Sequence, residues 1–149
     1  MGDALASAEV TQALGLEPDR ALDKGQVRSP RVDPRTGKPL VQRTGVWSIS
    51  SKRLTTTSNQ RHLSFLLDKL EPSADALRDV MARQGLEADF FCYWESASGD
   101  GGPVLSPGVL RRIAELGASL GYDFYGPCRD DDQPVGSPGA GQPGGENDS

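Results

Sequence analysis

The sequence predicts an α+β domain, a two-layer sandwich with a mostly antiparallel sheet and helices packed on one face. The first indication is an aromatic run at residues 88–96, dense enough to be a core strand in a chain with few aromatic residues. The second is a series of helical periodicities before and after that run. The third is a hydrophobic content of 36% with a net charge of −5, which suits one globular domain within 149 residues.

The N-terminal third contains two segments with a regular apolar pattern, separated by an irregular one. Residues 6–16 have helical spacing, with Ser7 as the expected N-cap and Gly15 as the stop. Residues 18–43 are rich in proline, glycine and arginine, so we expect a long basic loop there. Residues 44–50 alternate again and predict a half-buried strand.

Three further helices follow from spacing and end signals. Apolar residues at helical intervals predict a helix over residues 58–70. Pro72 sits at a favoured first-turn position of a second helix, which Gly85 ends. Ser106 and Pro107 form a strong start for a third, because a hydroxyl caps the helix and proline suits its first position.

The aromatic run divides by alternation into two sets of side chains. The set expected to face the helices is Phe90, Cys92 and Trp94, and the opposite set is Phe91, Tyr93 and Glu95. Because both sets are largely apolar, we expect both faces of this strand to be at least partly covered.

The C-terminal part completes the predicted sheet. Glycines at 98–102 predict a turn into a short strand through Val104 and Leu105, and residues 121–126 read as the final strand. This order favours a ferredoxin-like arrangement with its first strand missing. One domain would span residues 1–126, and residues 127–149 lack the apolar content to order, so they predict a disordered tail.

The composition bears on the cellular location of the protein and on its cofactors. No apolar run approaches the roughly 20 residues of a membrane helix, and the first residues lack the features of a leader. Cys92 lies in a core strand and Cys128 in the tail, so we expect reduced thiols and a cytoplasmic protein. The single histidine, His62, has no companion ligands, and we expect neither metal nor cofactor.

Seven short motifs carry a resemblance to a known family. They are Leu-Gly-Leu-Glu-Pro at 14–18, Lys-Gly at 24–25, Arg-Thr-Gly-Val-Trp-Ser at 43–48, Leu-Glu-Pro at 70–72, Phe-Cys-Tyr-Trp-Glu-Ser at 91–96, Leu-Ser-Pro at 105–107 and Tyr-Asp-Phe-Tyr at 122–125. From about residue 2 to 126 the chain resembles the bacterial family called domain of unknown function 4279. The resemblance implies a compact α+β fold and no established activity.

The start of the chain departs from that family. Its members usually open with a strand ahead of the Gly-Asp pair that here is Gly2 and Asp3. We expect, as the favoured explanation, that coding sequence for this strand lies upstream of Met1. The alternative is a sheet without that strand, whose exposed edge could pair with another chain.

The charges are distributed unevenly along the chain. Between Arg20 and Arg61 ten basic residues face two acidic ones, a net charge of +8, while the remainder carries −13. The candidate binding residues in this segment are Arg35, Lys38 and Arg43. A basic arm could grip phosphate or an acidic partner, or it could fold back on the acidic body. An acidic domain and an arm without aromatic residues argue against nucleic acid.

The predicted function is that of a non-catalytic binding or protein-interaction module. The expected partner is a protein or a small ligand, and self-association through an open edge of the sheet is a further possibility. Its candidate surface is the helix-free face of the sheet, with Phe91, Tyr93, Glu95, Asp123 and Tyr125. An immunity-type protein that shields a partner is one concrete version. The alternative is a small hydrolase-like enzyme that uses Glu95 and Asp123 as an acid and base pair.

Overall fold

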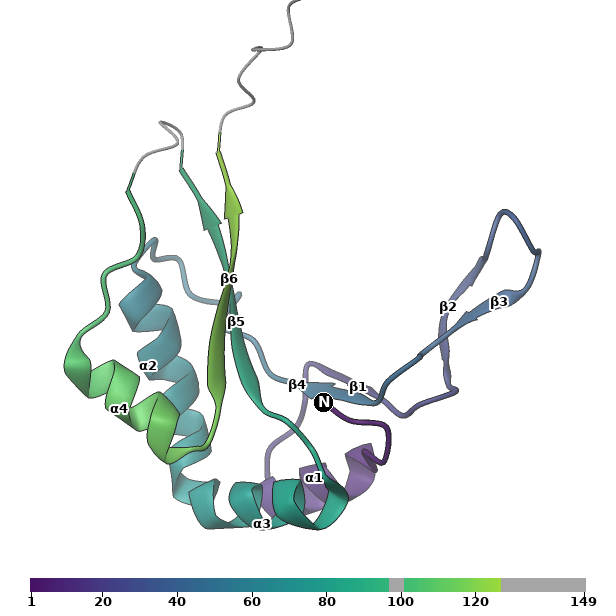
Figure 1. Cartoon of the computed structure of the whole chain (residues 1–149), viewed down its shortest axis with the longest axis horizontal. Coiled ribbons are helices and arrows are strands. Elements are labelled where there is room, and N and C mark those ends of the chain that lie inside the picture. The colour runs from purple at the N-terminus through teal and green to yellow at the C-terminus, as the bar shows by residue number, and fades with distance from the viewer. Residues whose placement is uncertain (97–100, 127–149) are drawn as a thin grey trace, which may run out of the picture.

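The computed structural model describes residues 1–96 and 101–126, and within them the chain combines helices with short sheets (Figure 1). The elements, in order, are α1 (Ser7–Leu14), β1 (Arg20–Leu22), β2 (Val27–Val32), β3 (Pro39–Val41), β4 (Val46–Ser48), α2 (Asn59–Leu70), the 3-10 turn η1 (Glu71–Ser73), α3 (Ala74–Gln84), β5 (Asp89–Glu95), α4 (Pro107–Glu115) and β6 (Ser119–Tyr125). The predicted α+β class is confirmed.

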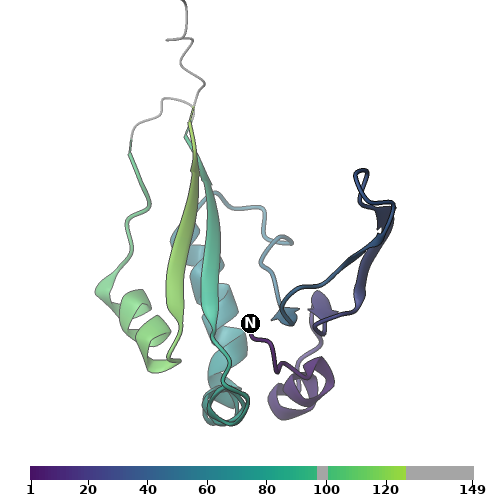
Figure 2. The same cartoon turned by 45° about the vertical axis from the view of Figure 1, so that its right-hand side comes forward.

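The hydrophobic core lies between the helices and one face of β5 and β6. α1 packs against α3, and α2 packs against α4. Both views show α2 and α4 beside the β5–β6 pair (Figures 1 and 2). The most completely buried side chains are Leu63, Leu67, Val80 and Leu116. Full burial of one such side chain contributes roughly 1.5–3 kcal/mol, so this cluster is the main source of stability.

Several predicted helix ends are confirmed. Gly15 after α1 and Gly85 after α3 adopt left-handed conformations, with φ of 63° and 61°. Residues with a β-carbon rarely adopt this conformation, which is why glycine ends these helices. At the start of α4 the Ser106 hydroxyl accepts a hydrogen bond from the Val109 N–H at 3.4 Å, with Pro107 in the first position.

The predicted N-cap of α1 is wrong. Ala6, and not Ser7, occupies the N-cap position. The N–H of Ser7 donates to Asp23 Oδ1 at 2.9 Å, and the N–H of Ala6 donates to Gln84 Oε1 at 3.2 Å. Side chains distant in sequence therefore satisfy the first turn, and no local pattern could reveal them.

β5 and β6 are parallel, with Asp89 opposite Ser119 and Glu95 opposite Tyr125. The chain returns through α4 to the starting end of β5, so both strands run the same way. The β1–β4 and β2–β3 pairs are antiparallel, and each sheet of the described residues has two strands. Two of the three pairs are thus antiparallel as expected, but the longest is not, and the ferredoxin-like arrangement is not confirmed.

The expected loop over residues 18–43 is corrected by the structure. It contains β1, which pairs with β4, and the β2–β3 hairpin. Proline is tolerated here because Pro39 is the first residue of a strand that has a partner on one side only. The hairpin extends away from the helices in both views (Figures 1 and 2).

Two other strand predictions differ from the structure. The strand expected over residues 44–50 is reduced to β4, and Val104 and Leu105 are in no strand. Most of the turn expected at 98–102, like the tail from residue 127, lies outside the described residues. Among the helices described, none has the length and apolarity to cross a bilayer.

Candidate functional site

The outer face of β5, which points away from the helices, is largely bare. Phe90 on the inner face is buried, whereas Phe91 and Tyr93 on the outer face are 69% and 60% exposed. The expectation that both faces of this strand are at least partly covered is therefore not met by the outer face. The helices supply one apolar layer only, and nothing in the described residues packs over the other side.

The parallel register places β6 residues beside this surface. Asp123 lies opposite Tyr93, and Tyr125 lies opposite Glu95. The rings of Tyr93 and Tyr125 are stacked, with centroids 4.6 Å apart and planes inclined by 27°. We call Phe91, Tyr93 and Tyr125 the aromatic face. Its rings project from two paired strands of the scaffold, and two of the three support each other by stacking.

Carboxylates surround the aromatic face. Asp89, Glu95 and Asp123 project from the same side of the pair, and neither strand contains lysine or arginine. The Tyr125 hydroxyl donates to Asp123 Oδ2 at 2.8 Å. This hydrogen bond, together with the carboxylate charge, raises the pKa of Tyr125 above its usual value. The surface is thus electronegative, and it offers ring faces and carboxylates to a cation.

Sequence reasoning placed Phe91, Tyr93, Glu95, Asp123 and Tyr125 on this face, and the structure brings them together. It overlooked Asp89, although alternation from Phe91 was a sufficient signal. The parallel register could not be anticipated, because it depends on where α4 delivers the chain.

The three basic candidates lie elsewhere. Arg35 and Lys38 are in the β2–β3 turn and Arg43 follows β3, all three exposed. None of the ion pairs found among the described residues involves them. Within residues 1–96 and 101–126, the basic segment pairs with acidic residues through Lys24, which contacts Asp3, and through Lys52, whose amine lies 3.9 Å from Asp19.

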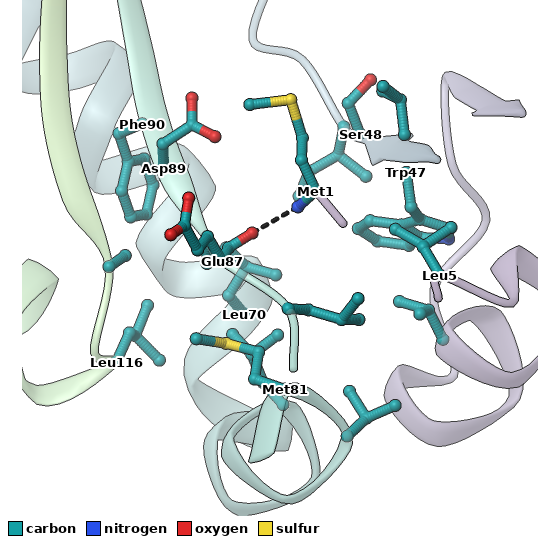
Figure 3. A pocket seen from close by; sticks show the side chains of 18 of the residues that line it. Met1, Leu5, Trp47, Ser48, Leu70, Met81, Glu87, Asp89, Phe90 and Leu116 are labelled. Carbon is teal, nitrogen blue, oxygen red and sulfur yellow. Dashed lines mark hydrogen bonds between the residues drawn. The ribbon is translucent and has the colours of Figure 1, made fainter. Parts of the chain in front are cut away.

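A cavity of about 340 Å³ opens between β4 and β5 (Figure 3). Met1 lies between Trp47 on one side and Phe90 on the other, with Leu70 and Met81 among the lining residues. The walls are mainly apolar. Sequence reasoning missed this cavity because its walls come from elements whose spacing no local pattern encodes.

Metal or nucleophile chemistry has no support in the part of the chain described. No group of three or more potential ligands gathers there. The His62 ring nitrogens lie 2.9 Å from Ser51 Oγ and 2.7 Å from the Thr56 carbonyl oxygen, which accounts for this side chain structurally. Cys92 is a half-buried free thiol against the core.

Comparison with known proteins gives one match. No curated protein and no solved structure is detectably similar. A family model described as a domain of unknown function, DUF4279, matches residues 1–127. Most of the chain is covered, including every helix and strand described above, so the protein belongs to the DUF4279 family.

Proposed function

We propose that this protein is a non-catalytic protein-interaction module that binds a basic segment of another protein on the outer face of β5 and β6. The observation that supports it most is the exposed Tyr93–Tyr125 stack, bordered by three carboxylates on strands without a basic residue. An isolated exposed aromatic residue needs no explanation, but a fixed and charged cluster is typical of a recognition surface.

Arginine is the side chain that fits this surface best. Its planar guanidinium stacks on tyrosine rings and pairs with carboxylates in a bidentate manner. One exposed cation–π contact contributes about 0.5–1 kcal/mol, so useful affinity needs several contacts at once. The aromatic face and its three carboxylates can supply them to a single extended basic segment.

The shape of the surface favours a protein partner over a small ligand. Small-molecule sites are concave and enclose most of the ligand. Here Phe91, Tyr93 and Tyr125 stand exposed on two strands. The cavity between β4 and β5 includes Phe91 at its margin but neither Tyr93 nor Tyr125 in its walls.

The proposal extends to a bacterial, cytoplasmic setting, in which a module of this kind could act as an immunity-type protein that shields a basic partner. The family resemblance supports the first part. The free thiol of Cys92 supports the second, because thiols stay reduced in the cytoplasm.

The hydrolase alternative is less well supported. Glu95 and Asp123 do share a face, but Glu95 lies opposite Tyr125, and Asp123 already accepts the Tyr125 hydroxyl. Acid and base pairs acquire different pKa values from burial in unlike surroundings. Glu95 is exposed, so it lacks buried surroundings of this kind.

The test is a fluorescence titration with a labelled peptide of alternating arginine and leucine, at low and at high salt. We expect the Tyr93→Ser/Tyr125→Ser double variant to bind at least tenfold more weakly than the unmodified protein. Phe124→Ser is the matched control, since Phe124 lies on the other face of β6 and is as exposed as Tyr93. It should bind like the unmodified protein.

Equal affinity for all three proteins would contradict the proposal, as would equally tight binding of an acidic peptide of the same length. Light scattering of the free protein is measured first. Association between copies that disappears in the double variant would mean that the face binds the basic hairpin of another copy, and not a foreign partner.

A second candidate surface is the β2–β3 hairpin. Arg35, Lys38 and Arg43 have no ion-pair partner among the described residues, so they are available to an anionic partner. An Arg35→Ser/Lys38→Ser/Arg43→Ser variant tests this with an acidic probe peptide. The surface is excluded if the affinity neither falls with salt nor changes in the variant.

A further inference from the structure

The β2–β3 hairpin makes few contacts with the rest of the molecule. β2 and β3 pack chiefly against each other, and the hairpin extends away from the helices in both views (Figures 1 and 2). A two-stranded hairpin by itself is at best marginally stable in water, because too little of its apolar surface is covered. A partner that covers such a hairpin would therefore stabilise it.

One face of the hairpin carries four aliphatic side chains. Val27 lies opposite Val41, and Val32 lies opposite Pro39, with an irregular register between the two pairs. Opposed residues of an antiparallel pair point to the same face, and so do residues two apart in one strand. The three valines are about half exposed, and Pro39 is exposed as well. We call these four residues the aliphatic face.

The aliphatic face is turned away from the body of the protein. Gln42 extends the pairing by one residue, because its N–H donates to the Gln26 carbonyl at 2.7 Å. It follows Val41 directly, so its side chain lies on the opposite side of the backbone. That side chain is buried, and its Nε2 donates to the Thr44 carbonyl at 2.6 Å. The side of the hairpin with Gln42 therefore faces the body, and the aliphatic face points to solvent.

Cations accompany the aliphatic face. Residues 27–43 contain five basic residues and one acidic residue, a net charge of +4. The acidic residue, Asp33, stabilises the turn, since its Oδ1 accepts the Arg35 N–H at 2.8 Å. Four of the basic side chains are exposed and take part in none of the ion pairs within the described residues: Arg28, Arg35, Lys38 and Arg43. The hairpin thus combines exposed aliphatic groups with uncompensated positive charge.

The length of the hairpin separates this charge from the acidic body. β2 has six residues, so its extended length is about 20 Å. The Debye length at physiological ionic strength is about 8 Å, so charges further apart than this are largely screened from each other. The tip can therefore approach an anionic surface while repulsion of the body stays weak.

We propose that the hairpin binds the surface of an anionic lipid bilayer. The aliphatic face enters the boundary between headgroups and acyl chains, and the basic side chains contact the lipid phosphates. Stable binding at a membrane surface needs two weak signals at once, and apolar insertion with a basic patch is one such combination. The cytoplasmic leaflet is anionic, which suits a basic hairpin on a cytoplasmic protein.

The size and composition of the hairpin favour a bilayer over an acidic protein. A standard protein interface buries roughly 800 Å² on each partner, more than four aliphatic side chains on a narrow hairpin supply. Protein interfaces are also enriched in aromatic residues, and residues 27–43 contain none. Pairing of two hairpins from different copies is opposed by their like charge. A bilayer requires no surface of matching shape.

The charge requirement is tested by flotation with vesicles of phosphatidylcholine and with vesicles of an equal mixture of phosphatidylcholine and phosphatidylglycerol. We expect the unmodified protein to bind only the anionic vesicles. The Arg35→Ser/Lys38→Ser/Arg43→Ser variant should bind them at least tenfold more weakly, because each basic residue near such a surface contributes about fivefold.

The matched control for charge is Arg53→Ser/Arg61→Ser/Arg83→Ser. It removes the same charge from exposed residues outside the hairpin. Its affinity for anionic vesicles should fall by less than about threefold, because these residues act on the membrane only through the screened net charge.

Insertion of the aliphatic face is tested with tryptophan reporters. Val41→Trp and Leu40→Trp place the same ring on opposite sides of β3, and Trp47 and Trp94 give both variants the same background. The anionic vesicles contain lipids brominated in their acyl chains, which quench nearby tryptophan emission. Quenching should be at least about twofold stronger for Val41→Trp, because its ring lies on the side that enters the bilayer.

Three results would overturn the proposal: equal binding to both vesicle compositions, equal losses in the two triple variants, and equal quenching of the two reporters. Displacement by soluble glycerol phosphate at the concentration of the lipid headgroups would also overturn it, since the ligand would then be a free phosphate. So would an acidic peptide that binds as tightly as the vesicles do, because the partner would then be an acidic protein.

The lipid proposal rests on the second candidate surface of the proposed function and names its partner, whereas the aromatic face is independent of it. Tyr93→Ser/Tyr125→Ser should bind vesicles like the unmodified protein, and the hairpin triple variant should bind the arginine–leucine peptide like the unmodified protein. Binding of the acidic peptide without binding of vesicles would refute the lipid proposal alone. Binding of neither would refute the candidate surface as well.

Discussion

Phe90 and Phe91 are adjacent and chemically identical, yet they have opposite surroundings. Phe90 is 6% exposed against the helices, and Phe91 is 69% exposed on the other side of the same strand. The difference shows that only one face of β5 packs against the helices. The inner face holds the fold together, and the outer face is exposed to solvent and contributes little to stability.

Truncation of each ring in turn tests this difference most strongly. Phe90→Ala should lower the free energy of unfolding by about 3–5 kcal/mol, because it removes buried surface and leaves a cavity. Phe91→Ala should change it by no more than about 0.5 kcal/mol. Urea unfolding measures both. Similar losses would mean that the outer face is covered in solution.

Gly45 and Gly102 also differ in their surroundings, and this difference can be tested in the same way. Gly45→Ala would place a β-carbon 2.9 Å from the Gly2 carbonyl oxygen, against backbone that cannot move aside, and should cost about 1–3 kcal/mol. Gly102→Ala is the control, since no atom lies within 4 Å of its added carbon. Gly2 and Gly45 exchange two backbone hydrogen bonds, at 3.3 and 3.0 Å, and a neutral Gly45→Ala in thermal unfolding would argue against this pairing.

Ion pairs form a weaker contrast. Arg112 is half-buried and donates to both Glu71 and Asp68, whereas the Arg78–Asp75 pair is more exposed. Arg112→Ala should cost about 1 kcal/mol and Arg78→Ala about 0.3 kcal/mol. Equal effects on the urea midpoint would contradict this ranking.

The same network predicts a pH dependence. The hydrogen bond from Arg112 holds the pKa of Glu71 below its usual value. The stability that this hydrogen bond contributes is therefore complete above the unfolded-state pKa of a glutamate, about 4.3. It is lost as the pH falls through the lower pKa that Glu71 has in the folded protein. Glu71→Gln should reduce the fall in stability on acidification, and an unchanged pH profile would oppose this.

The smallest effect concerns the aromatic face itself. Asp123→Asn should lower the pKa of Tyr125 toward its usual value of about 10, because it removes the negative carboxylate that accepts the hydrogen bond from the Tyr125 hydroxyl. Tyr122, whose pKa is raised mainly by burial, is the internal reference. Ultraviolet titration with tyrosine assignments by NMR should show a shift for Tyr125 and none for Tyr122.

Periodicity predicted most of the helices and the two long strands. α2, α3, α4 and β5 bury apolar stripes, so their spacing was informative, and Gly85 marked an end that backbone conformation requires. β1 and β3 were missed because each has only three residues, most of them exposed, and strands of that kind carry little apolar alternation.

The residues of the candidate site could be predicted from the sequence, but their arrangement in space could not. Alternation assigned Tyr93 and Tyr125 to one side of the sheet, yet their stacking depends on a parallel register that α4 sets from a distance. The bare outer face was also unexpected, since the apolar content of β5 suggested cover. Aromatic residues that stay exposed and those that pack in the core look alike in a sequence.

Hydroxyl-radical footprinting followed by mass spectrometry tests the central claim most directly, because it reports the exposure of both faces of β5 in one sample. We predict that Phe91, Tyr93 and Tyr125 are oxidised at least several-fold faster than Phe90 in the free protein, and that the arginine–leucine peptide protects them while leaving Phe124 unprotected. Slow oxidation of the aromatic face in the free protein, or unchanged oxidation at saturating peptide, would contradict the account.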